Sequence, residues 1–205
     1  MRRFSQTAYA VHDPKTGRWS KWQILEMPAD DKFNMARNGC SQWLVQPDGS
    51  LLVPMTIRND VKGYVTFSDD GLRYQPIKPW TFDDGSELGS YNTQQHWLAH
   101  SDGLFLSYTR RGAKNDHIPR NRAPIFLAQV DPEKPCVIRK SEKPIIPQRG
   151  AMLGNFGAAA VTASESWVTD AEYMLASQPN PRGANGSVFA ARVIRSRRNA
   201  LVPRK

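Results

Sequence analysis

The sequence contains only two cysteines in 205 residues, Cys40 and Cys136. They form no Cys-x-x-Cys pair and have no spacing typical of zinc ligands. We expect buried free thiols here rather than a disulfide. No group of Asp, Glu or His residues has metal-ligand spacing either. The sequence therefore predicts neither a metal site nor another cofactor.

Long apolar segments are also missing. No apolar run approaches the ~20 residues that a membrane-spanning helix needs. The basic start, residues 1–6, is not followed by the apolar region of a secretory signal. For the sequence as given we expect no membrane partner and a cytoplasmic location.

The net charge is +9, from 28 basic and 19 acidic residues. Five of the basic residues fall in the last eleven positions: Arg195, Arg197, Arg198, Arg204 and Lys205. The rest of the chain is therefore only mildly basic, and it contains no nucleic-acid-binding motif. We expect no nucleic-acid partner, and residues 197–205 are predicted to be a solvated basic tail.

No helical periodicity is sustained, and short extended segments recur instead. A strand that runs into a turn occurs at residues 8–14, 64–71, 126–132 and 188–193. Asp13, Asp69 and Asp131 mark three of these turns, at spacings of 56 and 62 residues. A repeat of this length, built of strands and turns, is typical of a β-propeller blade. A β-sandwich, the main alternative, has no reason to repeat at this period.

Each repeat contains further strands. A first strand is predicted at residues 40–45, 93–99 and 156–162. A second strand, after a hairpin turn, is predicted at 51–57, 104–109 and 167–173, and the first two of these turns contain Asp48-Gly49 and Asp102-Gly103. The predicted fold is therefore an all-β propeller of four-stranded antiparallel blades. The blades cover residues 31–80, 85–147 and 150–196, and residues 1–30 form the outer hairpin of a preceding blade. Three to four blades make only part of a ring, so we expect self-association through the open blade edges.

The stretch from Ser68 to Tyr74 (Ser-Asp-Asp-Gly-Leu-Arg-Tyr) resembles the Asp-box turn of sialidase-type propellers, one residue shorter and with Tyr in place of Trp. In such a turn the Asp side chain caps backbone N–H groups. The other repeats keep Asp13-Pro14 and Asp131-Pro132.

With residues 80–85, 91–97, 108–112, 121–124 and 154–157, the chain resembles the C-terminal part of sialidase-like (exo-α-sialidase, BNR Asp-box repeat) propellers. This resemblance implies a six-bladed ring, a carbohydrate ligand and glycoside hydrolysis. Members of the family are commonly longer and often exported. The sequence lacks the N-terminal part in which they carry an Arg-Ile-Pro arginine and a catalytic Asp.

Strand direction predicts which residues share one face. Because neighbouring strands are antiparallel, the starts of first strands and the ends of second strands meet at one end of each blade. We predict substrate-binding roles for the polar residues there and in the loop that follows: Arg37, Asn38, Arg58, Asn92, Arg110, His117, Arg122 and Asn155. Guanidinium groups bind carboxylates with two hydrogen bonds, which suits a sialic or uronic acid.

The catalytic hypothesis uses three residues. In the mechanism that the resemblance implies, a tyrosine is the nucleophile and a glutamate activates it, and we assign these roles to Tyr91 and Glu172. His96 is a candidate general base. The alternatives are that Tyr91 packs at the rim, that Glu172 pairs with an arginine, and that His96 is a core residue bonded to backbone. His117 is either a lid residue or simply solvated.

The tryptophans are expected in the core, except Trp80, which is expected to shape a groove. The leading functional hypothesis is a glycoside hydrolase of sialidase type, or a fragment of one. A non-catalytic carbohydrate- or protein-binding propeller and a uronate polysaccharide lyase are the alternatives. Activity on sialyl, uronyl or neutral glycosides distinguishes them.

Overall fold

The structure is a computed structural model of the 205-residue chain. It describes residues 8–24, 44–45, 51–56, 63–69, 75–76, 78–90, 94–153, 155–174 and 182–203. Within these residues nearly every regular element is a β-strand, and the exceptions are two short 3-10 helices, η1 (Pro119–Asn121) and η2 (Arg139–Ser141). The prediction of an all-β chain is confirmed.

The first sheet is a four-stranded antiparallel meander. It consists of β5 (Leu44–Val45), β6 (Leu51–Thr56), β7 (Gly63–Ser68) and β8 (Lys78–Pro79), in that spatial order. Consecutive strands are neighbours, as they are in a propeller blade. The predicted hairpin turn at Asp48-Gly49 connects β5 and β6 but lies outside the described residues.

The second sheet repeats this plan. It consists of β9 (His96–His100), β10 (Gly103–Tyr108), β11 (Ile125–Asp131) and β12 (Cys136–Val137), and β13 (Lys143–Ile146) also pairs with β11. The turn after β9 is the predicted Asp-Gly hairpin, which pairs Gly103 with His100. The loop from β10 to β11, residues 109–124, is the longest connection within this sheet.

The third sheet is arranged around β16 (Glu165–Tyr173). One side of β16 pairs with β15 (Gly157–Thr162) and β14 (Met152–Leu153), and the other pairs with β17 (Val188–Ile194). This sheet has four strands, but β14, β15 and β17 all pair with β16, so its strands do not follow one another in a simple four-stranded meander.

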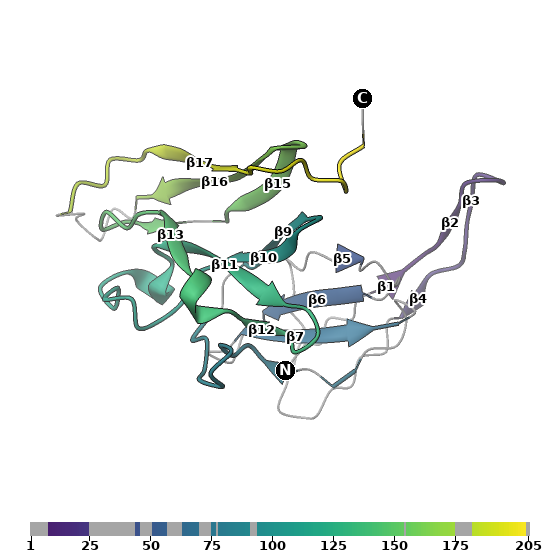
Figure 1. The fold of residues 1–205 in the computed structure, drawn as a ribbon, viewed down its shortest axis with the longest axis horizontal. Coiled ribbons are helices and arrows are strands. Elements are labelled where there is room, and N and C mark those ends of the chain that lie inside the picture. Colours follow the sequence, from purple (N-terminus) through teal and green to yellow (C-terminus); the bar gives the residue numbers. More distant parts are fainter. Residues whose placement is uncertain are drawn as a thin grey trace, which may run out of the picture.

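The three sheets lie one above another, with the second in the middle (Figure 1). Side chains of the second sheet alternate between its two neighbours, as the period-two geometry of a strand requires. One cluster joins Trp97, Leu106 and Tyr108 to Val65 and Phe82 on the side of the first sheet. A second cluster joins the second sheet to the third: Leu98, Ile125, Leu127, Phe156 and Val168. A meander sheet that packs face to face against a neighbour on each side is typical of a propeller blade, and the fold is a partial β-propeller.

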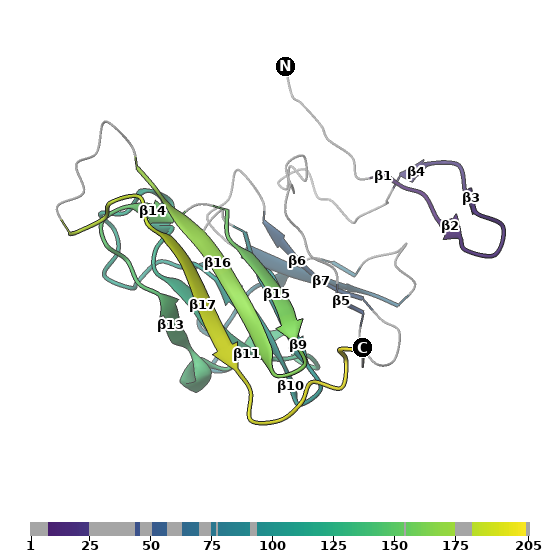
Figure 2. The same cartoon turned by 90° about the horizontal axis from the view of Figure 1, so that it is seen from above.

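The N-terminal hairpin extends away from the stacked sheets (Figure 2). It pairs β1 (Ala8–Tyr9) with β4 (Gln23–Ile24) and β2 (His12–Asp13) with β3 (Arg18–Trp19). The core positions predicted for Trp19 and Trp22 are wrong, because these side chains are 68% and 77% exposed. A two-stranded ribbon without a covering layer leaves its large side chains in solvent.

Two of the repeated aspartates, Asp13 and Asp131, cap their turns. Asp13 Oδ1 accepts a hydrogen bond from the backbone N–H of Lys15 at 2.8 Å. Asp131 Oδ1 accepts one from the N–H of Glu133 at 2.9 Å. An Asp carboxylate at the equivalent position thus caps the turn in each of these two repeats. The Asp-box candidate itself lies partly outside the described residues.

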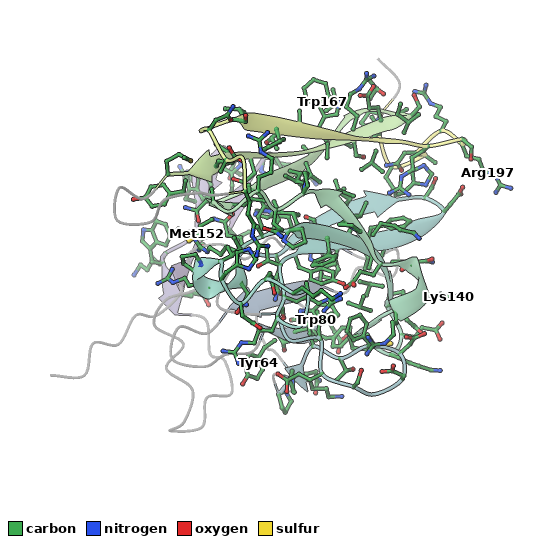
Figure 3. The ribbon with its side chains drawn as sticks, turned by 90° about the vertical axis from the view of Figure 1, so that its left-hand side faces the viewer. Tyr64, Trp80, Lys140, Met152, Trp167 and Arg197 are labelled. Carbon is green, nitrogen blue, oxygen red and sulfur yellow. The ribbon has the colours of Figure 1, made fainter. Side chains whose placement is uncertain are left out.

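Trp80 is a core residue and shapes no groove. It is 1% exposed, its Nε1 donates to Gln95 Oε1 at 3.0 Å, and its ring meets that of Trp97 edge-on. Figure 3 labels it within the stack, whereas Trp167 lies on the outer surface of the third sheet. Trp167 is 38% exposed, so its predicted core position is also wrong. Cys136 is a buried free thiol, as expected.

Residues 197–203 do not form a freely solvated tail, in contrast to the prediction for 197–205. Asn199 is 3% exposed, and its Nδ2 donates to the Ala99 carbonyl at 2.9 Å. Its Oδ1 accepts from the Ser101 N–H at 3.0 Å. Arg197 and Arg198, which directly precede Asn199, remain exposed. The run of basic residues therefore includes one buried polar residue, Asn199, that holds the segment against the second sheet.

Candidate functional site

The strand registers place the predicted residues at one end of the second and third sheets. His96 begins β9 and pairs with Ser107, near the end of β10. Glu172 is near the end of β16 and pairs with Leu153. The two sheets point the same way, because the His96 ring lies 5.0 Å from that of Phe156, just before β15.

Six predicted site residues therefore share this end: His96, Arg110, His117, Arg122, Asn155 and Glu172. The other five lie outside the described residues: Arg37, Asn38, Arg58, Tyr91 and Asn92. The Tyr91–Glu172 pairing thus stays a prediction.

The loop of residues 109–124 covers part of this end and has an unusual backbone. Lys114, Arg120 and Asn121 have φ values of 54°, 59° and 51°. Side chains other than glycine rarely adopt this left-handed region, and such positions persist only where the surroundings hold them. Three such positions within eight residues indicate that this loop has a defined conformation.

Asn115 holds the loop from inside. It is completely buried, and its Nδ2 donates to the carbonyls of Arg110 and Ala123 at 2.9 and 2.7 Å. Asn121 Nδ2 in turn donates to the Asn115 carbonyl at 3.3 Å. One buried amide therefore joins both ends of the loop, which leaves its middle to present side chains to solvent.

The exposed side chains on this loop include Asp116, His117 and Arg120. His117 Nε2 lies 3.1 Å from Gln148 Oε1, which links the loop to the segment that leads into the third sheet. Asn155, in the same sheet's connection to β15, is also exposed. These side chains supply a carboxylate, an imidazole, a guanidinium and an amide, the groups that hydrogen-bond sugar hydroxyls and carboxylates.

Arg110 is committed to an ion pair. Its Nε and Nη2 donate to the two oxygens of Glu142 at 2.7 and 2.6 Å, and its Cζ lies 4.8 Å from the centre of the Phe126 ring. Its side chain is 17% exposed. The hydrogen bonds that Arg110 donates to Glu142 raise the pKa of Arg110 despite its partial burial. A substrate-binding role for Arg110 stays a prediction, and it would require this pair to open.

A tyrosine–glutamate pair that the sequence reasoning missed lies beside it. Tyr108 Oη donates to Glu142 Oε2 at 2.6 Å, and Tyr108 is completely buried. Burial, followed by the negative charge of Glu142, raises the pKa of Tyr108 well above its ordinary value of 10.0. A phenol that is harder to ionise is a poor nucleophile, so this pair is structural. Side chains alternate between the two faces of β10, and this alternation, which directs Tyr108 into the core, could have identified the tyrosine from the sequence.

Glu172 is the most fully bonded carboxylate of the candidate site. Arg149 Nε and Nη2 donate to its two oxygens at 2.8 and 3.1 Å. Oε2 also accepts from the backbone N–H groups of Asn185, Gly186 and Ser187 at 2.9, 3.0 and 3.0 Å. Burial alone would raise the pKa of Glu172, but the hydrogen bonds from Arg149 and the backbone outweigh it and lower the pKa.

These contacts match the alternative in which Glu172 pairs with an arginine. The partner, Arg149, was not among the predicted residues. It also donates to Asn185 Oδ1 at 2.7 Å and to Ser187 Oγ at 3.1 Å, so it fastens residues 185–187 to the end of β16. A carboxylate with five donors and a lowered pKa is a weak base, which makes activation of Tyr91 unfavourable in this arrangement.

His96 sits between the second and third sheets. Its Nε2 lies 2.9 Å from Gln94 Oε1. Burial lowers its pKa, although a backbone hydrogen bond at Phe156 partly opposes the shift. The shift favours the neutral imidazole, the form that a general base requires. Its half-buried place between sheets fits the core alternative, and the role of general base stays a prediction.

The described residues contain no group of three His, Cys, Asp or Glu side chains that could hold a metal ion. Within the same residues no helix is long and apolar enough to cross a membrane.

No protein-family model matches the sequence, and no curated protein matches it. Among solved structures, the chain is similar to a protein of unknown function from Dyadobacter fermentans, with a TM-score of 0.56 at 17% identity. The match covers 93% of this chain and 50% of that one, so the chain spans about half the length of this neighbour. The likeness shows a shared fold and transfers no activity.

Two further structures are more weakly similar. One is a bifunctional GH43-CE protein of Bacteroides eggerthii, with a TM-score of 0.47, 12% identity, and coverage of 84% of this chain and 21% of that one. The other is the Bombyx mori GH32 beta-fructofuranosidase, with a TM-score of 0.47, 12% identity, and coverage of 91% and 47%. Scores at this level carry no argument about function.

Proposed function

We propose that the chain binds a glycan at the end of the blades where β10 and β16 finish. The observation that carries the proposal is the loop of residues 109–124. It contains three left-handed residues, the buried Asn115 joins its two ends, and it presents Asp116, His117 and Arg120 to solvent. A rigid loop loses little conformational entropy on binding, so even a few polar groups can provide measurable affinity.

The ligand class follows from the exposed groups. Arg120 offers a planar fork for a carboxylate, and His117 and Asn155 offer donors and acceptors for ring hydroxyls. An acidic sugar, sialic or uronic, uses all of them. The resemblance of the sequence to sialidase-like propellers supports the same class of ligand.

Binding is tested by titrating the chain with sialic acid, glucuronic acid and glucose, using isothermal calorimetry or NMR shifts. We expect acidic sugars to bind more tightly than glucose. Arg120→Ala should weaken acidic-sugar binding roughly tenfold or more, as expected for a charged hydrogen bond. Arg198→Ala is the matched control, because Arg198 is exposed on the C-terminal segment that contacts the opposite end of the second sheet. Equal affinity for all three sugars, or equal loss in both variants, contradicts the proposal.

Hydrolysis is the second candidate function. It rests on Tyr91 as the nucleophile and on the imidazole of His96, which lies at the same end as the loop, and it requires Glu172 to leave its five hydrogen-bond donors before it can activate Tyr91. Turnover of sialyl, uronyl and neutral aryl glycosides measures it directly. A rate abolished by Tyr91→Phe and retained by Tyr173→Phe, an exposed tyrosine at the end of β16, would support it. Binding without turnover leaves the glycan-binding function alone.

A further inference from the structure

The third sheet has one covered and one open face. Along β16, Val168 is completely buried, whereas Trp167 and Tyr173 are 38% and 55% exposed. In the neighbouring β17, Val188 and Ile194 are 78% and 69% exposed. Single exposed apolar residues are ordinary, but a whole sheet face of them marks an interaction surface. Figure 1 shows this sheet as the outermost layer of the stack.

The equivalent positions of the second sheet are covered by a neighbouring sheet. Gly103 pairs with His100 and Glu165 pairs with Thr162, so the two residues are equivalent positions after their hairpin turns. Two residues further on, Phe105 and Trp167 are therefore equivalent. Phe105 packs in the cluster between the second and third sheets, whereas Trp167 is exposed.

The flanking strands agree. Leu98 pairs with Phe105 as Ala159 pairs with Trp167, and Leu127 pairs with Ser107 in the position where Ala190 pairs with Thr169. Leu98 is 2% exposed and Leu127 is 9% exposed, because the third sheet covers them. Ala159 and Ala190 are exposed. Positions that are interior in one blade are thus on the surface of the next.

The charges on the open face are already satisfied within it. Arg192 and Glu165 form an ion pair across β16 and β17, and Trp167 Nε1 donates to Glu165 Oε1 at 2.6 Å. A neighbour that covered the face would therefore leave no isolated charge behind. An apolar sheet surface is the matching partner, as in the contact between the second and third sheets.

We infer that this open face, made of the exposed residues of β15, β16 and β17, binds a second copy of the chain. The Dyadobacter fermentans protein shares the fold, and this chain covers only 50% of it, so that protein is about twice as long as this chain. Two copies of this chain together have about the length of that protein. Within the described residues β17 pairs only with β16, so its outer edge also offers free backbone groups to the neighbour.

The test is the mass of the 205-residue chain in solution, by sedimentation velocity and light scattering from about 1 to 100 µM. We expect a discrete species of twice 23.1 kDa. The double variant Val188→Glu, Ala190→Glu places two carboxylates on the open face at exposed positions and should raise the dimer dissociation constant at least tenfold. Ile194→Lys, at another exposed position of β17, is a second such variant.

The control is Val11→Glu with Trp22→Glu, which changes exposed apolar residues on the N-terminal hairpin and should leave the dimer intact. Circular dichroism and melting curves establish that each variant folds. A monomer throughout the concentration range, a continuum of aggregates, or a dimer that only the hairpin variant disrupts would each overturn the inference.

Discussion

Arg149 and Glu172 form a two-fold hydrogen-bonded ion pair at 2.8 and 3.1 Å, with the carboxylate 2% exposed and the guanidinium 31% exposed. The pair joins the segment before β14 to the end of β16. Three backbone N–H groups complete the shell of the carboxylate. A residue chosen from the sequence as a catalytic activator therefore fixes a loop.

Glu172→Gln removes this charge and places an amide against donors. Breaking a buried pair costs about 3–5 kcal/mol, and the partial exposure of Arg149 reduces this to about 2–4 kcal/mol of unfolding free energy. Urea denaturation at pH 7 measures the loss. Glu133→Gln, at an exposed turn, is the control and should change stability by less than about 0.5 kcal/mol. Equal stability of both variants would show that the pair contributes nothing.

The same residue predicts a pH dependence. The folded-state pKa of Glu172 lies below its ordinary value of 4.5, so its contribution is fully present above that pH and is lost as the pH falls through the folded pKa. The stability difference between wild type and Glu172→Gln should therefore shrink as the pH is lowered from 5 to 3. Denaturation curves at several pH values measure it. A difference that is constant over this range contradicts the assignment.

Tyr108→Phe tests whether the buried tyrosine–glutamate pair is structural. The variant loses one hydrogen bond to a charged group, which is worth about 1.5–3 kcal/mol of stability. Glycan binding and any glycosidase turnover should stay unchanged, because Tyr108 is completely buried. A variant of normal stability that has lost turnover would instead identify Tyr108 as a catalytic residue.

Asn115→Ala should loosen the loop of residues 109–124. It leaves the carbonyls of Arg110 and Ala123 without their buried donor, at a cost of roughly 2–3 kcal/mol. We expect faster amide hydrogen exchange in the loop and weaker binding of acidic sugars. Asn185→Ala, which changes an exposed amide on another loop, should leave exchange in this loop as in the wild type.

Asn199→Ala should release the C-terminal segment from the second sheet. The side chain makes one hydrogen bond to Ala99 and one to Ser101, so the loss is about 1–2 kcal/mol. The Ser101 amide should exchange faster, and the exposed neighbour change Arg198→Ala should not affect it. Unchanged exchange at Ser101 would restore the prediction of a solvated tail.

The sequence determined the features that depend on local chemistry. The short extended segments and the hairpin turns between them predicted the strands of the second sheet, and the repeat period predicted stacked blades. The caps at Asp13 and Asp131 followed from the turn motif alone. Antiparallel pairing also brought His96, Arg110 and Glu172 to one end, because strand order and direction suffice to place them.

Only the tertiary structure decided what those side chains contact. Arg149 and Glu172 are 23 residues apart, Arg110 and Glu142 are 32 apart, and no local pattern announces such a pair. Whether Trp167 is core or surface depends on the presence of a further sheet, since its own strand is the same in either case. Burial is a property of the assembled layers. The sequence could therefore predict which residues lie at the ends of the blades, whereas only the packing of the layers decided which of their side chains remain exposed.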